Sequence, residues 1–172
     1  MPPVTPEESA PVVERAQERD WRQLSGVRLA ALAESPGAFG STLAREQQYD
    51  DQDWRAWTRE AATFLAFAGE QPIGMAAGIE VDRPDERALI AMWGSPDHRG
   101  KGAASALVAA VRGWAHDEGA VRLTLWVTRT NEPAGRLYRR LGFVETGASK
   151  QLPSNPALVE DQLTLDLPQR SG

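Results

Sequence analysis

The sequence of 172 residues contains no cysteine and only two histidines, His98 and His116. The missing cysteines exclude disulfide bonds, thiolate metal ligands and a cysteine nucleophile that would carry an acyl group. Two histidines at these positions are too few for a histidine metal cluster. We therefore predict no metal site.

Positive charge is also scarce, because 24 acidic residues outnumber 19 basic ones and the net charge is −5. That balance argues against broad binding to nucleic acid or to an anionic membrane surface. The chain has no apolar run of the roughly 18 residues that a membrane span needs. The first ten residues hold prolines and acids instead of a signal sequence. We expect a cytoplasmic protein with no nucleic-acid or membrane partner.

The length suits one domain around one core, since two ordinary domains need a longer chain. We predict a single domain over residues 1–172, with loose ends at residues 1–10 and 168–172. No internal repeat or low-complexity tract divides it.

The first third of the chain is predicted to be mainly helical after a short strand at residues 11–16. Asp20 is a candidate N-cap for a helix that ends near residue 35, before a proline. Two shorter helices follow, and their candidate caps are Ser41 for the first and Asp51 or Asp53 for the second.

The middle of the chain changes to a strand pattern. Residues 63–68, 73–81 and 88–93 predict three successive strands with short turns, which is an antiparallel meander. A helix over residues 101–117 and an alternating strand over residues 121–128 come next. A strand, a crossover helix and a second strand of this length predict a right-handed parallel pair.

The last third begins with a helix that opens at Thr130 or Asn131 and closes at Gly142. Strands are predicted from Phe143 and around Leu163 to Leu167, with a surface loop over residues 147–159 between them. These elements predict a mixed α/β fold: a central, largely antiparallel sheet of six or seven strands, flanked by about four helices and containing one parallel pair.

The segment Arg99-Gly100-Lys101-Gly102-Ala103-Ala104-Ser105 joins a strand to a helix and predicts an anion site. The first turn of a helix has unpaired N–H groups and the positive end of the helix dipole, and glycine lets an anion approach the backbone. Three other structures share part of this pattern: a dinucleotide-binding G-x-G-x-x-G/A fingerprint, a nucleotide P-loop, and glycines that only form a tight turn. A dinucleotide site would place the glycines directly after the strand, but about five residues intervene here. A P-loop has four residues between its two glycines, whereas Gly94 and Gly100 have five between them.

The chain resembles the GNAT superfamily of acyl-CoA-dependent N-acetyltransferases at two motifs. The family's pyrophosphate motif, Gln/Arg-x-x-Gly-x-Gly/Ala, is matched by residues Arg99 to Ala104. Its second motif, an Asn followed by Leu-Tyr-x-x-Leu-Gly-Phe, is matched by Asn131 and by residues Leu137 to Phe143. The resemblance is tight over residues 88–146, and segments farther upstream resemble a bacterial subgroup often left without an assigned substrate. Many relatives carry Val where this chain has Gly94.

The resemblance implies acetyl-CoA as the acyl donor, lying where the two parallel strands splay apart. The cofactor-binding residues would be Met92, Trp93, Gly94, Arg99, Gly100, Lys101, Gly102, Ala103, Ala104, Ser105, Asn131 and Tyr138. The first three would contact the pantetheine arm and residues 99–105 the pyrophosphate. Tyr138 would also be catalytic, as the acid that protonates the leaving thiolate, because a phenol with a pKa of ~10 keeps its proton at neutral pH.

The general base is sought among Glu46, Glu80 and Glu86, with Glu46 ranked first because relatives place that helical segment over the acceptor site. The implied function is transfer of an acetyl group to a primary amine of a small molecule or peptide by direct attack. The alternative is a non-catalytic acyl-CoA-binding or sensing module. The acids Asp50, Asp51 and Asp53 hint at a cationic acceptor, although helix capping explains them equally well. The sequence does not distinguish a monomer from a homodimer.

Overall fold

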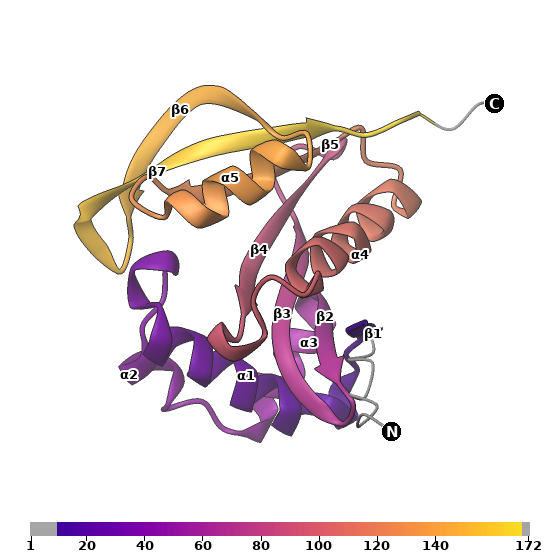
Figure 1. Cartoon of the computed structure of the whole chain (residues 1–172), viewed down its shortest axis with the longest axis vertical. Helices are drawn as coiled ribbons and strands as arrows, with labels where there is room; N and C mark the ends of the chain where they lie inside the picture. The colour runs from indigo at the N-terminus through magenta and orange to yellow at the C-terminus, as the bar shows by residue number, and fades with distance from the viewer. Residues whose placement is uncertain (1–9, 170–172) are drawn as a thin grey trace, which may run out of the picture.

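A computed structural model describes residues 10–169, and its core is one seven-stranded sheet with helices on both faces (Figure 1). The strand order is β1-β2-β3-β4-β5-β7-β6. The elements in chain order are β1 Val12–Arg15, η1 Glu18–Asp20, α1 Trp21–Glu34, η2 Pro36–Ala38, α2 Leu43–Glu46, α3 Asp51–Glu60, β2 Ala62–Ala68, β3 Gln71–Glu80, β4 Glu86–Gly94, η3 Pro96–His98, α4 Ala103–Asp117, β5 Arg122–Thr128, α5 Glu132–Arg140, β6 Val144–Leu152 and β7 Asn155–Asp166.

The predicted meander and parallel pair are both confirmed. Strands β2, β3 and β4 pair antiparallel in sequence order, and β4 pairs parallel with β5. The parallel pairing covers only three residues of β4, Glu86 to Ala88, after which the two strands diverge. Figure 1 shows α4, which connects the two strands, lying beside β4 and over β3 on one face of the sheet. Beyond Ala88 the edges of β4 and β5 that face each other are not paired with one another, whereas the other edge of each strand stays paired with β3 or β7.

Two apolar cores lie on opposite faces of the sheet. Neighbouring residues of β2 divide between them, since Leu65 belongs to one core and Ala66 to the other. One core packs α4 and α5 on the sheet through side chains such as Leu107 and Val111. The other packs α1 and α3, and it contains Trp54. The sheet therefore separates an α4–α5 side from an α1–α3 side.

Close approach of α4 explains a glycine in β3. A Cβ added at Gly78 would lie 2.4 Å from the ring of Trp114 on α4. Such a distance is far inside van der Waals contact, so only glycine lets this helix pack against the strand.

The predicted loop over residues 147–159 is wrong, because these residues form most of the β6–β7 hairpin. Eight of the nine residues of β6 are exposed, so the strand has none of the apolar alternation by which strands are recognised. Its backbone pairing with β7 holds it at the sheet edge instead. Pro153 lies in the hairpin turn, where it interrupts no pairing.

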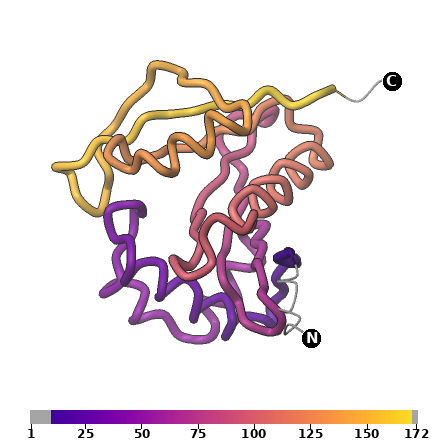
Figure 2. The backbone as a smooth tube through the Cα atoms, in the orientation of Figure 1, coloured from indigo at the N-terminus to yellow at the C-terminus, as the bar shows by residue number. Residues whose placement is uncertain are grey.

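The tip of the β6–β7 hairpin packs on the segment between α1 and α2, and Figure 2 shows these distant parts of the chain side by side. The hydroxyl of Ser154 donates to the carbonyl of Phe39, and Thr128 Oγ1 donates to the carbonyl of Gly37 at 2.7 Å. These contacts fix the segment against the end of β5.

Several predicted boundaries shift by one to three residues. The two short helices are capped by Thr42 and Asp50, in place of Ser41 and of Asp51 or Asp53. The helix predicted from residue 101 begins at Ala103. Of the predicted loose ends, residues 1–9 and 170–172 lie outside the described residues. No helix within residues 10–169 is both long and apolar enough to cross a membrane.

Candidate active site

A cavity of about 610 Å³ opens where β4 and β5 diverge. Its walls come from the ends of these two strands, the turn before α4, the start of α5 and the segment after α1. All but one of the predicted cofactor-binding residues line it: Met92, Trp93, Gly94, Arg99, Gly100, Gly102, Ala103, Ala104, Ser105, Asn131 and Tyr138. Lys101 is not among the lining residues. The fold thus brings two motifs separated by a helix and a strand to one cavity.

The turn before α4 has the backbone of an anion site. Gly100 and Gly102 have φ values of +82° and +92°, a left-handed conformation that other residues adopt only with strain. Gly102 is the N-cap of α4, a helix of 15 residues, so the unpaired N–H groups of its first turn begin at the cavity wall. Together with the positive end of the helix dipole, they can hold a phosphate group without any side chain.

A carboxylate missed by the sequence analysis, Glu34, ties the turn to α1. Its Oε2 accepts hydrogen bonds from Trp93 Nε1 at 2.9 Å and from Arg99 Nη2 at 3.0 Å. The hydroxyl of Ser35 donates to the same oxygen. The hydrogen bond from Ser35, then that from Trp93, and the charge of Arg99 lower the pKa of Glu34. Glu34 therefore stays ionised and orients two cofactor-site residues, but it is a poor proton acceptor.

Arg99 is held from two sides. Its Nε also donates to the carbonyl of Gly94 at 3.2 Å, which closes the turn between β4 and α4. The guanidinium is thus fixed beside the anion site before any ligand arrives.

The end of β4 contains a bulge that no motif announced. Ile90 pairs with Ala77 and Trp93 with Met75, so two residues of β4 lie opposite the single residue Ala76. One of the two, Ala91, has a φ of +56°, which costs an L-residue roughly 1–2 kcal/mol. A bulge leaves its extra residue out of the ladder. Peptide groups at the cavity wall are thereby released from the sheet.

Tyr138 and Asn131 reach the cavity from α5. The Tyr138 side chain is 6% exposed and packs edge-on against Phe143, with ring centroids 5.7 Å apart. Burial raises the pKa of Tyr138, because the phenolate would lose its hydration. The hydroxyl therefore remains a proton donor at every physiological pH. Asn131 caps the helix through Oδ1, which accepts from the N–H of Ala134 at 3.4 Å.

The predicted base Glu46 does not lie at the cavity. Its carboxylate is 1% exposed and accepts two hydrogen bonds from Arg28, from Nε at 2.8 Å and from Nη2 at 3.0 Å. The Arg28 guanidinium in turn lies over the rings of Phe39 and Trp57. A carboxylate engaged on both oxygens inside a core cannot take a proton from an amine at the cavity, so the prediction of Glu46 as the base is wrong.

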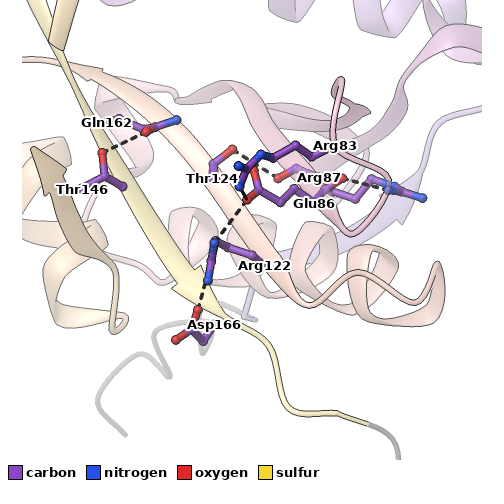
Figure 3. A network of polar contacts seen from close by, with 8 residues as sticks. All are labelled: Arg83, Glu86, Arg87, Arg122, Thr124, Thr146, Gln162 and Asp166. Carbon is purple, nitrogen blue, oxygen red and sulfur yellow. Dashed lines mark hydrogen bonds and ion pairs between the residues drawn. The ribbon is translucent and has the colours of Figure 1, made fainter. Parts of the chain in front are cut away.

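The other two candidate bases, Glu80 and Glu86, do not line the cavity either and are not placed to act as the general base. Glu86 lies at the closed end of the β4–β5 pair, where Oε1 accepts from Arg83 at 3.2 Å and from Arg122 at 3.3 Å (Figure 3). Arg122 also bonds Asp166 of β7. This network joins the paired ends of three strands, opposite to the end where the cavity opens.

The acidic run that hinted at a cationic acceptor is explained by capping. Asp50 and Asp53 form a capping box at the start of α3, each carboxylate accepting from the backbone N–H of the other. Trp54 of the same helix belongs to the α1–α3 core. Neither feature contributes to the cavity wall.

Comparison with known proteins places the chain in a family. The profile described as "Acetyltransferase (GNAT) family" matches residues 29–143, more than half of the chain. Streptothricin acetyltransferase of Streptomyces lavendulae is 32% identical over 94 residues, which are 54% of this chain and 50% of that protein. N-acetyltransferase 8F1 of Rattus norvegicus is 34% identical over 88 residues, 49% of this chain and 40% of that protein. The chain thus spans about half the length of the curated relatives it matches.

Solved structures resemble the chain over nearly its whole length. An acetyltransferase of the GNAT family from Streptococcus pneumoniae superposes with a TM-score of 0.75 at 18% identity, covering 92% of this chain and 99% of that one. A protein from Salmonella typhimurium, solved with its cofactor acetyl-CoA, gives a TM-score of 0.75 at 17% identity over 95% of this chain and 98% of that one. At these identities the likeness establishes the fold. The family profile carries the assignment further: the chain belongs to the Acetyltransferase (GNAT) family.

Proposed function

We propose that the protein transfers an acetyl group from acetyl-CoA to a primary amine by direct attack. The observation that carries the proposal is the cavity itself, in which a helix N-terminus with two left-handed glycines and a protonated tyrosine line the same space. The first suits the pyrophosphate of the donor and the second suits its leaving sulfur. The diverging ends of β4 and β5 supply main-chain partners for the pantetheine arm between them.

The chemistry requires one bond to form and one to break. The amine attacks as its neutral form, the new C–N bond forms at the thioester carbonyl, and the C–S bond breaks. A main-chain N–H released by the β4 bulge can polarise the carbonyl oxygen. The attacking nitrogen gives up one proton to water, while Tyr138 donates its proton to the departing sulfur and then recovers one from solvent. Since the chain has no cysteine, no acyl-cysteine intermediate can arise.

The acceptor is proposed to be a small molecule or a peptide. Streptothricin acetyltransferase, the relative from Streptomyces, favours a small-molecule amine, and the relatives named N-acetyltransferase 8 are consistent with an amine of either kind. The cytoplasmic location and the absence of a nucleic-acid or membrane partner stay predictions from the sequence.

Release of free thiol from acetyl-CoA, measured over a panel of amines and unacetylated peptides, tests the function. We expect thiol release that depends on an amine and yields the acetylated amine by mass spectrometry. The non-catalytic alternative predicts tight coenzyme A binding by calorimetry with no amine-dependent release, and that result would overturn the proposed transfer.

The anion site is tested by substituting alanine for Gly102, with Gly119→Ala as the matched control. Both glycines have left-handed φ values, and a Cβ at either position meets open space, so the two variants carry a similar backbone strain. Only Gly102 lines the cavity. We expect coenzyme A affinity, measured by calorimetry, to fall about tenfold for Gly102→Ala because the strained turn moves its N–H groups. Equal affinities for the two variants would place the phosphates elsewhere.

A further inference from the structure

Two side chains of β5, Trp126 and Thr128, line the cavity from the face of the sheet that α4 and α5 do not cover. Their neighbours Leu125 and Val127 point into the α4–α5 core, so alternation places Trp126 and Thr128 on the other face. The hydrogen bond from Thr128 to Gly37, in the segment after α1, agrees with this placement. Since the anion turn and Tyr138 belong to the α4–α5 side, this second face is where an acceptor can approach.

A positive charge already lies beside Trp126. The ammonium of Lys150, on the edge strand β6, lies 4.4 Å from the ring centroid of Trp126 and 3.8 Å from Oε2 of Glu160. An aromatic face and a carboxylate around one cation are the elements of an ammonium-binding site. In this chain the ammonium of Lys150 occupies the position that the ammonium of a bound ligand would take.

Glu160 is the unusual member of the group. It is 7% exposed on β7, directly opposite Thr128 on one side and Lys150 on the other, so its side chain shares their face of the sheet. Burial raises the pKa of Glu160, and the charge of Lys150 only partly opposes that effect. The 3.8 Å separation is too long for a direct hydrogen bond. The carboxylate has therefore lost hydration without gaining a hydrogen bond from Lys150. A cation that reaches hydrogen-bonding distance would stabilise it more than Lys150 does.

The ammonium of Lys150 can be displaced from its position beside Glu160 and Trp126. Its side chain is 46% exposed, on a strand whose outer edge faces solvent, so its ammonium can move into water with little loss. Trp126 lines the cavity, whereas Lys150 and Glu160 lie behind it. An ammonium that passes from the cavity along the Trp126 ring would then meet both the ring and Glu160.

We propose that Trp126 and Glu160 bind a second cationic group of the acceptor, in the place where the ammonium of Lys150 lies, so that diamines and other polycationic amines are preferred substrates. This inference rests on the proposed acetyl transfer. It assigns Glu160 to substrate specificity, with no part in proton transfer.

The test compares 1,5-diaminopentane with pentylamine, which has the same chain and one charge fewer. For wild type we expect the lower KM with the diamine. Glu160→Gln, which keeps the side-chain shape, should raise the KM for the diamine about tenfold and leave that for pentylamine nearly unchanged. Lys150→Met should act in the opposite direction and lower the KM for the diamine, because a competing cation is removed. Asp166→Asn, the loss of an ion-paired acid at the far end of the same strand, serves as the control.

Equal effects of Glu160→Gln on both amines, or a raised diamine KM in Lys150→Met, would overturn the inference and leave the acetyl transfer standing. A calorimetric titration of 1,5-diaminopentane into the protein with coenzyme A needs no turnover. If no amine is acetylated but wild type binds the diamine about tenfold more tightly than Glu160→Gln does, the proposed function fails and the cation site stands.

Discussion

Tyr138→Phe is expected to lower kcat by at least about 100-fold while leaving the fold intact. The ring remains, so its edge contact with Phe143 and its place in the α4–α5 core are kept. Only the hydroxyl is lost, and with it the proton that the leaving sulfur needs. The KM for acetyl-CoA should change little, because the proposed contacts with the phosphates and the pantetheine arm come from other residues. Steady-state kinetics with any accepted amine measures both constants.

The pH dependence of this variant follows from the direction of the pKa shift. Burial raises the pKa of Tyr138 above its ordinary value, so the hydroxyl is fully protonated from pH 6 to about 9. Its ionisation therefore causes no fall in kcat at the basic end of that range. The loss in kcat should therefore be the same across that range. The chain's other tyrosine, Tyr49, packs against Trp54 outside the cavity, and Tyr49→Phe removes the same atom as a control. A kcat equal to wild type in Tyr138→Phe would end its assignment as the acid.

Glu46→Ala is expected to destabilise the protein by about 3–5 kcal/mol, because it leaves the buried Arg28 cation without its carboxylate. The loss is a property of the pair. Replacing both partners with apolar side chains, as in Arg28→Met with Glu46→Leu, should restore most of the free energy of unfolding. Urea denaturation of Arg28→Met, of Glu46→Leu and of the double variant measures this coupling.

The same residue separates a structural role from a catalytic one. If Glu46→Gln remains folded, its kcat/KM should keep the acidic limb of the wild-type pH profile, since the carboxylate is engaged by Arg28 and lies outside the cavity wall. Loss of that limb, with the stability unchanged, would return Glu46 to the position of general base.

The parts of the fold that the sequence predicted are those with strong local signals. The glycine turn, the stripe of α5 and the alternation of β5 each depend on neighbouring residues, and each was found in its expected place. The hairpin of β6 and β7 was missed because its stability comes from pairing along an edge. An exposed polar strand of this kind carries no apolar pattern.

The site divides in the same way. Residues of the two motifs lie at the cavity as predicted, because each motif is a short run of residues within one local turn or helix and can be identified from the sequence alone. Glu34, the bulge at Ala91 and Glu160 belong to no motif. Their importance arises only in the folded chain, where β4 and the turn after it contact Glu34, β3 pairs across the bulge and β6 pairs beside Glu160. Glu46 failed for the complementary reason. A glutamate on a short helix looks available in the sequence, and only the fold reveals that Arg28 occupies it.

The central claim is that the donor lies between β4 and β5 with its pyrophosphate on the turn before α4. A titration of 15N-labelled protein with coenzyme A, followed by backbone amide shifts, locates it directly. We predict that the largest shifts fall on Gly94 and on residues 99–105, whose amides line or adjoin the cavity. Shifts confined to another surface, such as the shallow hollow beside Arg112 and His116, would contradict the account.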